Sequence, residues 1–110
     1  MDKKIYIAGP ITSRLSTYKA EFMSAEKRLR DMGYSLIMNP AVLPLGFEYE
    51  DYMNITAAML KACDIIVLLE GWETSDGCQR ECALAKELDK TILVGLNEAE
   101  ELIEGKLCTL

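Results

Sequence analysis

The chain has 110 residues and a net charge of −6; half of its residues are hydrophobic and 27% are charged. This length and balance fit a single folded domain over residues 1–110 and exclude a disordered chain. The acidic charge, without a basic stripe, argues against binding to a nucleic acid polymer, whose phosphates attract basic surfaces.

Strands and helices are predicted to alternate along the whole chain. β-rich or apolar runs that end at Gly, Pro or Asn indicate strands, and apolar residues at steps of three and four indicate helices. In chain order we expect a strand at 5–8, a helix at 16–32, a strand at 34–38, a helix at 48–63, a strand at 64–69, a helix at 75–88, a strand at 91–94 and a short helix at 98–103. This order predicts an α/β fold of the Rossmann or flavodoxin type: a small parallel sheet of about four to five strands flanked by helices in three layers.

The apolar positions of each helix predict its buried face. The expected buried residues are Tyr18, Phe22, Ala25, Leu29 and Met32 in the first helix, Tyr52, Ile55, Met59 and Leu60 in the second, and Leu84, Ala85 and Leu88 in the third. The second helix also carries Met53, Ala57 and Ala58, so it is apolar on more than one face. The sheet can bury only one face of such a helix, so its other apolar face is expected to pack against a second subunit. This predicts a homo-oligomer, a dimer or larger.

In parallel sheets, ligands bind outside the carboxyl ends of the strands. That rule brings the segments Gly9-Pro10, Asn39-Pro40 and Gly71-Trp72 to one crevice, together with the start of the third helix. At that start, Ser75 is a good N-cap, and Gly77 lowers helix stability by about 1 kcal/mol relative to Ala. A close approach of a ligand to the backbone would explain the glycine.

Glu81 lies one turn after Gly77 on the same helix face, beside the apolar positions that face the core. A carboxylate there is uncommon unless it is paired or used, although the spacing alone also fits a solvated helix residue. Trp72 either stacks on a base or sugar or covers the core or a subunit contact. Asn39 shapes a turn and is also a candidate ligand contact, as are Tyr49 and Tyr52 beside the loop over the crevice.

The four cysteines, Cys63, Cys78, Cys82 and Cys108, form no Cys-x-x-Cys pair, and the chain has no histidine. We therefore expect structural thiols, no metal site and no cofactor. The start of the chain is polar and no long apolar run follows, so we expect a cytoplasmic protein with no membrane association.

Four segments together resemble a known family: Ile5-Tyr-Ile-Ala-Gly-Pro10, Asn39-Pro40, Leu60-x-x-Cys-Asp64 and Gly71-Trp-Glu-x-Ser-x-Gly-x-x-x-Glu81. They are similar to the nucleoside 2-deoxyribosyltransferase-like superfamily and, more narrowly, to its small bacterial and phage branch DUF4406. The resemblance spans about residues 3–95. It implies a pocket for a small nucleoside or nucleotide ligand, lined in part by Gly9 and Pro10.

The resemblance also implies roles for individual residues. Glu81 matches the glutamate that attacks the anomeric carbon, and Tyr6 matches the tyrosine beside that carboxylate. Ser75, with the N–H groups near Gly77, matches the position that holds a phosphate in the 5′-monophosphate N-hydrolases. We count Trp72 and Asn39 among the candidate ligand-binding residues of the same pocket.

Two departures from the family pattern weaken catalysis more than binding. Thr56 stands where the active enzymes carry an aspartate that can protonate the leaving base, and a threonine hydroxyl is a poor general acid near neutral pH. The family also completes each site with a polar residue from a neighbour's C-terminal segment, for which this chain offers Asn97, Thr109 or its terminal carboxylate. Asp51 and Asp76 are alternative acids, and the spacing favours neither.

The leading hypothesis is cleavage or transfer of the N-glycosidic bond of a (deoxy)nucleoside or its 5′-monophosphate through Glu81. The first alternative is a nucleotide-binding protein that sequesters its ligand without turnover, because Thr56 replaces the expected acid. The second alternative is a structural or interaction module that neither binds nor cleaves nucleotides.

Overall fold

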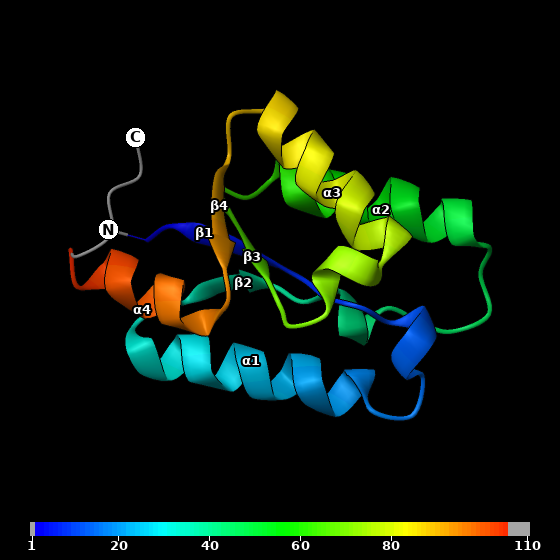
Figure 1. Cartoon of the computed structure of the whole chain (residues 1–110), viewed down its shortest axis with the longest axis horizontal. Helices are drawn as coiled ribbons and strands as arrows, with labels where there is room; N and C mark the ends of the chain where they lie inside the picture. Colours follow the sequence, from blue (N-terminus) through cyan, green and yellow to red (C-terminus); the bar gives the residue numbers. More distant parts are fainter. Residues whose placement is uncertain (1, 106–110) are drawn as a thin grey trace.

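The computed structural model describes residues 2–105, which alternate between strands and helices as the sequence predicts (Figure 1). The elements are β1 (Lys4–Ala8), α1 (Tyr18–Met32), β2 (Leu36–Met38), α2 (Tyr49–Lys61), β3 (Ile65–Leu68), α3 (Asp76–Glu87), β4 (Thr91–Val94) and α4 (Leu96–Ile103). Short 3-10 helices, η1 (Thr12–Arg14), η2 (Pro40–Val42) and η3 (Trp72–Thr74), follow the first three strands. None of the helices within residues 2–105 is long and apolar enough to cross a membrane.

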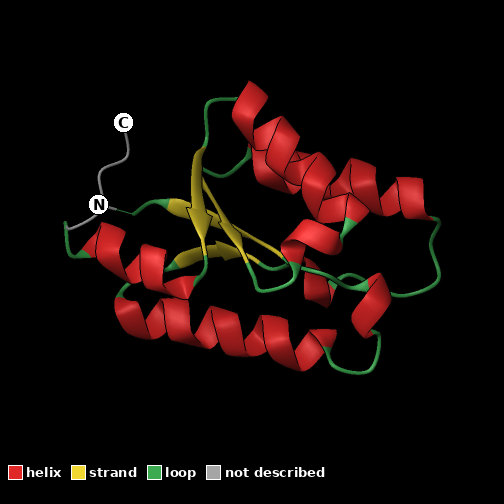
Figure 2. Ribbon diagram, in the orientation of Figure 1, coloured by secondary structure: helices red, strands yellow, loops and turns green. Residues whose placement is uncertain are grey.

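The four strands form one parallel sheet in the order β2-β1-β3-β4. Helices α1 and α4 cover one face of the sheet, and α2 and α3 cover the other, as Figure 2 shows. The predicted three-layer α/β fold is therefore confirmed. After β1 the chain moves outward to β2 and then returns to β3 on the other side of β1, so the topological switch point lies between β1 and β3.

The alternation of side chains along β1 divides the core into two parts. Ile5 and Ile7 pack toward α1 and α4, where the predicted face of α1 is buried. Tyr6 and Ala8 point to the opposite face and pack beneath α2 and α3. This alternation places the hydroxyl-bearing Tyr6 in the same layer as the helix that carries Glu81.

The predicted inward face of α2 is correct for Leu60, which is fully buried, and for Met59, which packs against the core, but it is wrong for Ile55. The helix buries Met53, Thr56 and Leu60, while Ile55 remains 40% exposed. The polar Thr56 lies between Met53 and Leu60 on the buried face. A prediction based only on apolar residues passes over Thr56 and therefore assigns Ile55 to this face.

The predicted face of α3 is correct for Ala85, which is fully buried, and for Leu84, which packs against the same core cluster. It is wrong for Leu88, which is 39% exposed. Leu88 is the C-cap residue, and its position just beyond Glu87 takes it off the helix face that packs on the sheet.

Candidate functional site

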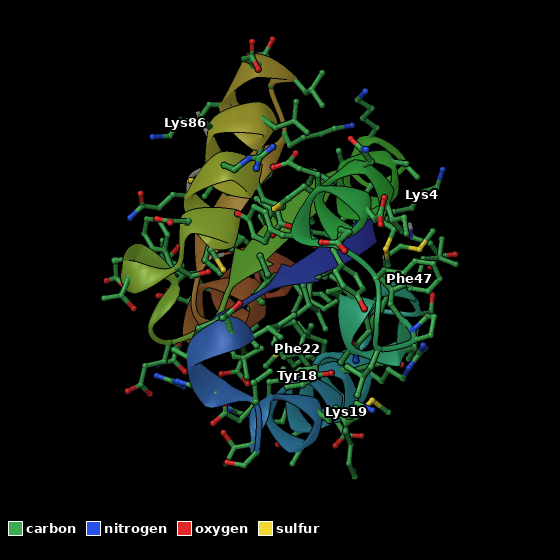
Figure 3. The ribbon with its side chains drawn as sticks, turned by 90° about the vertical axis from the view of Figure 1, so that its right-hand side faces the viewer. Lys4, Tyr18, Lys19, Phe22, Phe47 and Lys86 are labelled. Atoms are coloured by element: carbon green, nitrogen blue, oxygen red, sulfur yellow. The ribbon has the colours of Figure 1, made fainter. Side chains whose placement is uncertain are left out.

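A cavity of about 360 Å³ opens at the carboxyl ends of the strands, beside the switch point of the sheet. Its wall comes from the segment after β1, the first half of α1, the loop over 43–47, and the first turns of α2 and α3. Figure 3 faces this side of the molecule, with Tyr18 and Phe22 of α1 and Phe47 of the loop labelled. The volume is in the range of small-molecule sites, and the position is the one expected for ligands of parallel α/β sheets.

Tyr6 and Glu81 form a buried polar pair in the wall of this cavity. The Tyr6 hydroxyl donates a hydrogen bond of 2.8 Å to Oε2 of Glu81. Glu81 is only 7% exposed and Tyr6 only 1%. The distance is that of a strong O–H···O bond to a carboxylate. Two residues 75 positions apart in the chain are therefore joined at one point of the cavity.

Burial sets the protonation behaviour of this pair. Removal from water raises the pKa of the Glu81 carboxyl, while hydrogen bonds from Thr56 and Tyr6 and the charge of Arg80 partly lower it again. Burial, and then the charge of Glu81, raise the pKa of Tyr6 well above its usual value. Tyr6 thus stays a neutral donor at neutral pH, and Glu81 is the group that can carry negative charge.

Thr56 is the third polar side chain at this point. It lies on the buried face of α2, lines the cavity, and is 6% exposed. Its hydroxyl donates a long hydrogen bond of 3.5 Å to the Met53 carbonyl. Its nearness to the pair lowers the pKa of both Tyr6 and Glu81. The family resemblance placed Thr56 at the position of the acid that the active enzymes carry, and the fold brings this residue near Glu81.

The first turn of α3 supplies free backbone donors. Ser75 is the N-cap, as predicted, because its Oγ accepts the N–H of Cys78 at 3.2 Å. The N–H of Gln79 bonds to the Ser75 carbonyl at 2.9 Å. The N–H groups of Asp76 and Gly77 lie too early in the helix for an intrahelical acceptor, so they are available to an anion or a polar ligand group.

Gly77 is not required by packing. A Cβ added there would meet Met53 Sδ at 3.5 Å and the Tyr49 hydroxyl at 3.7 Å, which are ordinary contacts. The glycine lines the cavity, so its missing side chain leaves room over the helix start. Gly9 differs, since a Cβ there would press on Leu69 and Phe22 at 3.1 Å.

Three of the predicted ligand-binding residues are not among those that line the cavity: Pro10, Asn39 and Trp72. The Asn39 side chain is used within the protein, accepting the N–H of Ala41 at 2.9 Å and donating to Glu26 at 3.0 Å. Trp72 packs against the core beneath α3. Ligand contacts by these three residues stay predictions.

Sequence reasoning missed the apolar wall of the cavity. Leu15, Leu43 and Leu45 line it, and Phe47 stands at its edge with 57% of its surface exposed. The hydroxyl of Tyr52 fixes the loop by donating to the Pro44 carbonyl at 2.6 Å and accepting the Phe47 N–H at 3.2 Å. The available signal was the run of large apolar residues in a loop that is otherwise marked by Pro44 and Gly46.

Arg80 ties the first turns of α2 and α3 together on the outer side of the cavity. Its guanidinium forms a forked ion pair with Glu50 at 2.8 and 3.2 Å and lies 5.5 Å from the ring centroid of Tyr49. Tyr49 lines the cavity. The pair therefore holds one cavity residue in place without entering the cavity.

The described cysteines, Cys63, Cys78 and Cys82, are free and buried. Cys78 lines the cavity, and burial raises the pKa of its thiol to about 11. It is therefore a neutral thiol at neutral pH and not a nucleophile. Cys108 and Thr109 lie outside the described residues. Among residues 2–105, no three Cys, Asp or Glu side chains gather in a way that could hold a metal ion.

Comparison with known proteins gives a family and a fold. The family described as "Domain of unknown function (DUF4406)" matches residues 3–94. No curated protein matches the chain in sequence. Among solved structures, the chain is similar to a 2-desoxiribosyltransferase from Leishmania mexicana, with a TM-score of 0.66 and 23% sequence identity. The likeness covers 84% of this chain and 63% of that one, so the chain spans less than two thirds of the enzyme's length. The protein thus has a deoxyribosyltransferase-like fold.

Proposed function

The chain belongs to the DUF4406 family, and from this premise and the geometry of the cavity we propose that it cleaves or transfers the N-glycosidic bond of a nucleoside or nucleoside 5′-monophosphate. In this proposal Glu81 is the nucleophile and Tyr6 orients its carboxylate. Gly9, Ser75 and Gly77 line the ligand site. The fold shared with a deoxyribosyltransferase supports the ligand class.

One observation carries the proposal: a buried carboxylate, held by the Tyr6 hydroxyl at 2.8 Å, opens into a cavity at the switch point of the sheet. A carboxylate with no structural partner of opposite charge in the core is expensive to keep. Its place in a ligand-sized cavity supports a chemical use.

The chemistry follows from the nature of the nucleophile. An Oε of Glu81 attacks C1′ of the sugar and forms an ester, while the C1′–N bond breaks and its electron pair leaves with the base. Water, or the nitrogen of a second base, then attacks C1′ and frees the carboxylate. The first outcome is hydrolysis, and the second is transfer. Tyr6 fixes the attacking carboxylate by donating to one of its oxygens, which leaves the other to react.

The start of α3 supports binding of a polar or anionic group of the ligand. The N–H groups of Asp76 and Gly77 point from a helix N-terminus, where the helix dipole favours negative charge. Ser75 itself is engaged as the cap of Cys78, so in this proposal its contribution is to order that turn. Nucleosides and their 5′-monophosphates are therefore both included.

The test is to incubate the protein with ribo- and deoxynucleosides and their monophosphates and to follow base release by chromatography. We expect release by the wild type and loss of at least about 100-fold in Glu81→Gln, because a covalent nucleophile is removed. The matched control is Glu87→Gln, an exposed residue of the same helix that lies away from the cavity. Equal rates in wild type and Glu81→Gln would overturn the mechanism.

A second candidate function is ligand binding without turnover. The observation that favours it is Thr56, which stands beside Glu81 and supplies no acid for a departing base. Calorimetric titration with the same ligands distinguishes the two functions. Micromolar binding with no product formation would support this candidate, whereas rapid product formation would reject it.

We further propose that the protein forms a homo-oligomer through surfaces that include the outer side of α2. Ile55 on this helix is 40% exposed. A large apolar side chain on an exposed helix face gains free energy when a partner covers it. Light scattering at micromolar concentration tests this proposal, and a monomeric mass would reject it.

A further inference from the structure

The cavity holds a single charged side chain. In the part of the chain that the structure describes, Glu81 is the only residue lining it that carries charge at neutral pH, and no Lys or Arg lines it. Arg80, the neighbouring cation, lies on the outer side of α3 and is already paired with Glu50. Within the cavity, the Tyr6 hydroxyl donates to Glu81 at 2.8 Å, and the Thr56 hydroxyl lies near enough to lower the pKa of the carboxyl. A ligand that enters therefore meets a buried negative charge with no cation among the described residues that line the cavity, and only the outlying Arg80 offsets that charge in part.

Aromatic side chains line much of the same cavity. Six of the chain's eight aromatic residues line the cavity: Tyr6, Tyr18, Phe22, Phe47, Tyr49 and Tyr52. Aromatic faces attract cations, and sites that combine aromatic rings with a carboxylate recognise positively charged ring systems and ammonium groups. The outer side of Tyr49 already receives the Arg80 guanidinium in this manner.

Among the described residues that line the cavity, none is suited to protonate a leaving base. A neutral nucleobase departs with an extra electron pair and needs a proton, which a general acid normally supplies. The hydroxyl of Thr56 is a poor acid, and the pKa values of Tyr6 and of the Cys78 thiol are raised by burial. A base that already carries a positive charge needs no proton, because the electron pair of the broken bond neutralises it.

Building on the proposed nucleophilic role of Glu81, we infer that the preferred substrates are nucleosides whose base is positively charged, such as pyridinium ribosides and N7-alkylated purine nucleosides. An Oε of Glu81 forms a bond to C1′, the C1′–N bond breaks, and its electron pair stays on the base nitrogen, so the base leaves neutral. Water then hydrolyses the ester and releases the free sugar, the carboxylate of Glu81 and one proton.

The experiment compares substrates that differ mainly in charge. Nicotinamide riboside has a cationic ring, and dihydronicotinamide riboside has a neutral ring of nearly the same shape. 7-Methylguanosine and guanosine, each with ribose and with 2-deoxyribose, form the second set. For each compound, kcat/KM is divided by its uncatalysed rate constant, because charged bases leave faster even in water. We expect this ratio to be at least about 100-fold higher for the cationic members, since a missing general acid accounts for 10²–10⁴.

Binding of unreactive probes tests recognition separately from chemistry. 1-Methylnicotinamide is a cation and nicotinamide is neutral, and neither has a sugar to lose. We expect the wild type to bind the cation about tenfold more tightly, as one carboxylate with aromatic contacts allows. Glu81→Gln should remove most of this preference, and Phe47→Leu should reduce it. Val42→Ala is the matched control, because Val42 is exposed and is not among the cavity-lining residues.

The outcomes separate this inference from the proposed function. Preferential acceleration of the cationic substrates that Glu81→Gln abolishes supports both. Neutral nucleosides or monophosphates accelerated to the same extent, still through Glu81, would overturn the inference and leave the proposed function standing. Failure to cleave any nucleoside, charged or neutral, would overturn both. Equal binding of the two probes by the wild type would also overturn the inference.

Discussion

Replacing Glu81 by glutamine should abolish activity and at the same time stabilise the fold at neutral pH. The carboxylate is 7% exposed, and burial raises its pKa above the value it has in the unfolded chain. The native state therefore binds a proton at this site more tightly than the unfolded state does. The stability that this group contributes is present at acid pH and is lost as the pH rises through the raised pKa of the folded state.

The expected gain in the free energy of unfolding comes from removing the buried charge of Glu81. The hydrogen bonds to this carboxylate offset only part of the cost of burying that charge. Glutamine has nearly the same shape, and its Oε1 can still accept the Tyr6 hydroxyl. We expect the free energy of unfolding at pH 7.5 to rise by about 0.5–2 kcal/mol, in the range of single stabilising changes. For a chain of this length, that corresponds to a Tm increase of roughly 2–8 °C.

Urea and thermal unfolding of both proteins at pH 7.5 and pH 4 measure this difference. At pH 4 the wild-type carboxyl is largely protonated, so we expect the advantage of Glu81→Gln to shrink there. Glu87→Gln should change the free energy of unfolding by less than about 0.5 kcal/mol at either pH, because the side chain is exposed. A variant less stable than wild type at pH 7.5, with a gap that widens as the pH rises, would refute the reasoning.

Three further predictions concern the same cavity. Tyr6→Phe removes the hydrogen bond to Glu81, so the free energy of unfolding in urea should fall by about 1.5–3 kcal/mol, and the acid limb of the pH–rate profile should move to higher pH as the pKa of Glu81 rises further; an unchanged profile would contradict this. Gly77→Ala should raise the free energy of unfolding by up to about 1 kcal/mol, and with it Tm, because alanine favours the helix. The same change should weaken ligand binding measured by calorimetry. Unaltered binding would mean that no ligand approaches this backbone. Cys78 should react with a thiol reagent at pH 8 only when the protein unfolds, because its pKa is about 11, and rapid labelling of the native protein, mapped by mass spectrometry, would count against that value.

The order of strands and helices was predictable from the sequence because the apolar residues of each helix recur at steps of three and four, while the strands are short apolar runs. The unbroken run Ile65–Leu68 is fully buried between the two helical layers, and the steps of α1 match its buried face. The buried face of α2 was predictable only in part: Leu60 is buried as expected, whereas Thr56 is polar and still occupies a buried position. A functional site places polar residues where a core would have apolar ones, so the apolar pattern of α2 does not reveal that Thr56 is buried.

The position of Glu81 beside an apolar helix face indicated a buried carboxylate, and the spacing to Gly77 indicated a helix start near it. Its contact with Tyr6 was implied only by family resemblance, because no local pattern joins two residues 75 positions apart. The loop wall around Phe47 could not be predicted, since its geometry depends on the Tyr52 hydroxyl reaching back to Pro44. Asn39 stood out in the sequence, yet its hydrogen bonds are made within the protein.

The most direct test of the account is whether the sugar becomes attached to Glu81 during turnover. The protein would be mixed with nicotinamide riboside or a deoxynucleoside and quenched in acid within seconds. Intact-mass spectrometry and peptide mapping would then locate any adduct. We predict that the wild type gains the mass of one glycosyl group on the peptide that contains Glu81 and that Glu81→Gln gains none. Base release by the wild type without an adduct on that peptide, or with equal release by Glu81→Gln, would contradict the account.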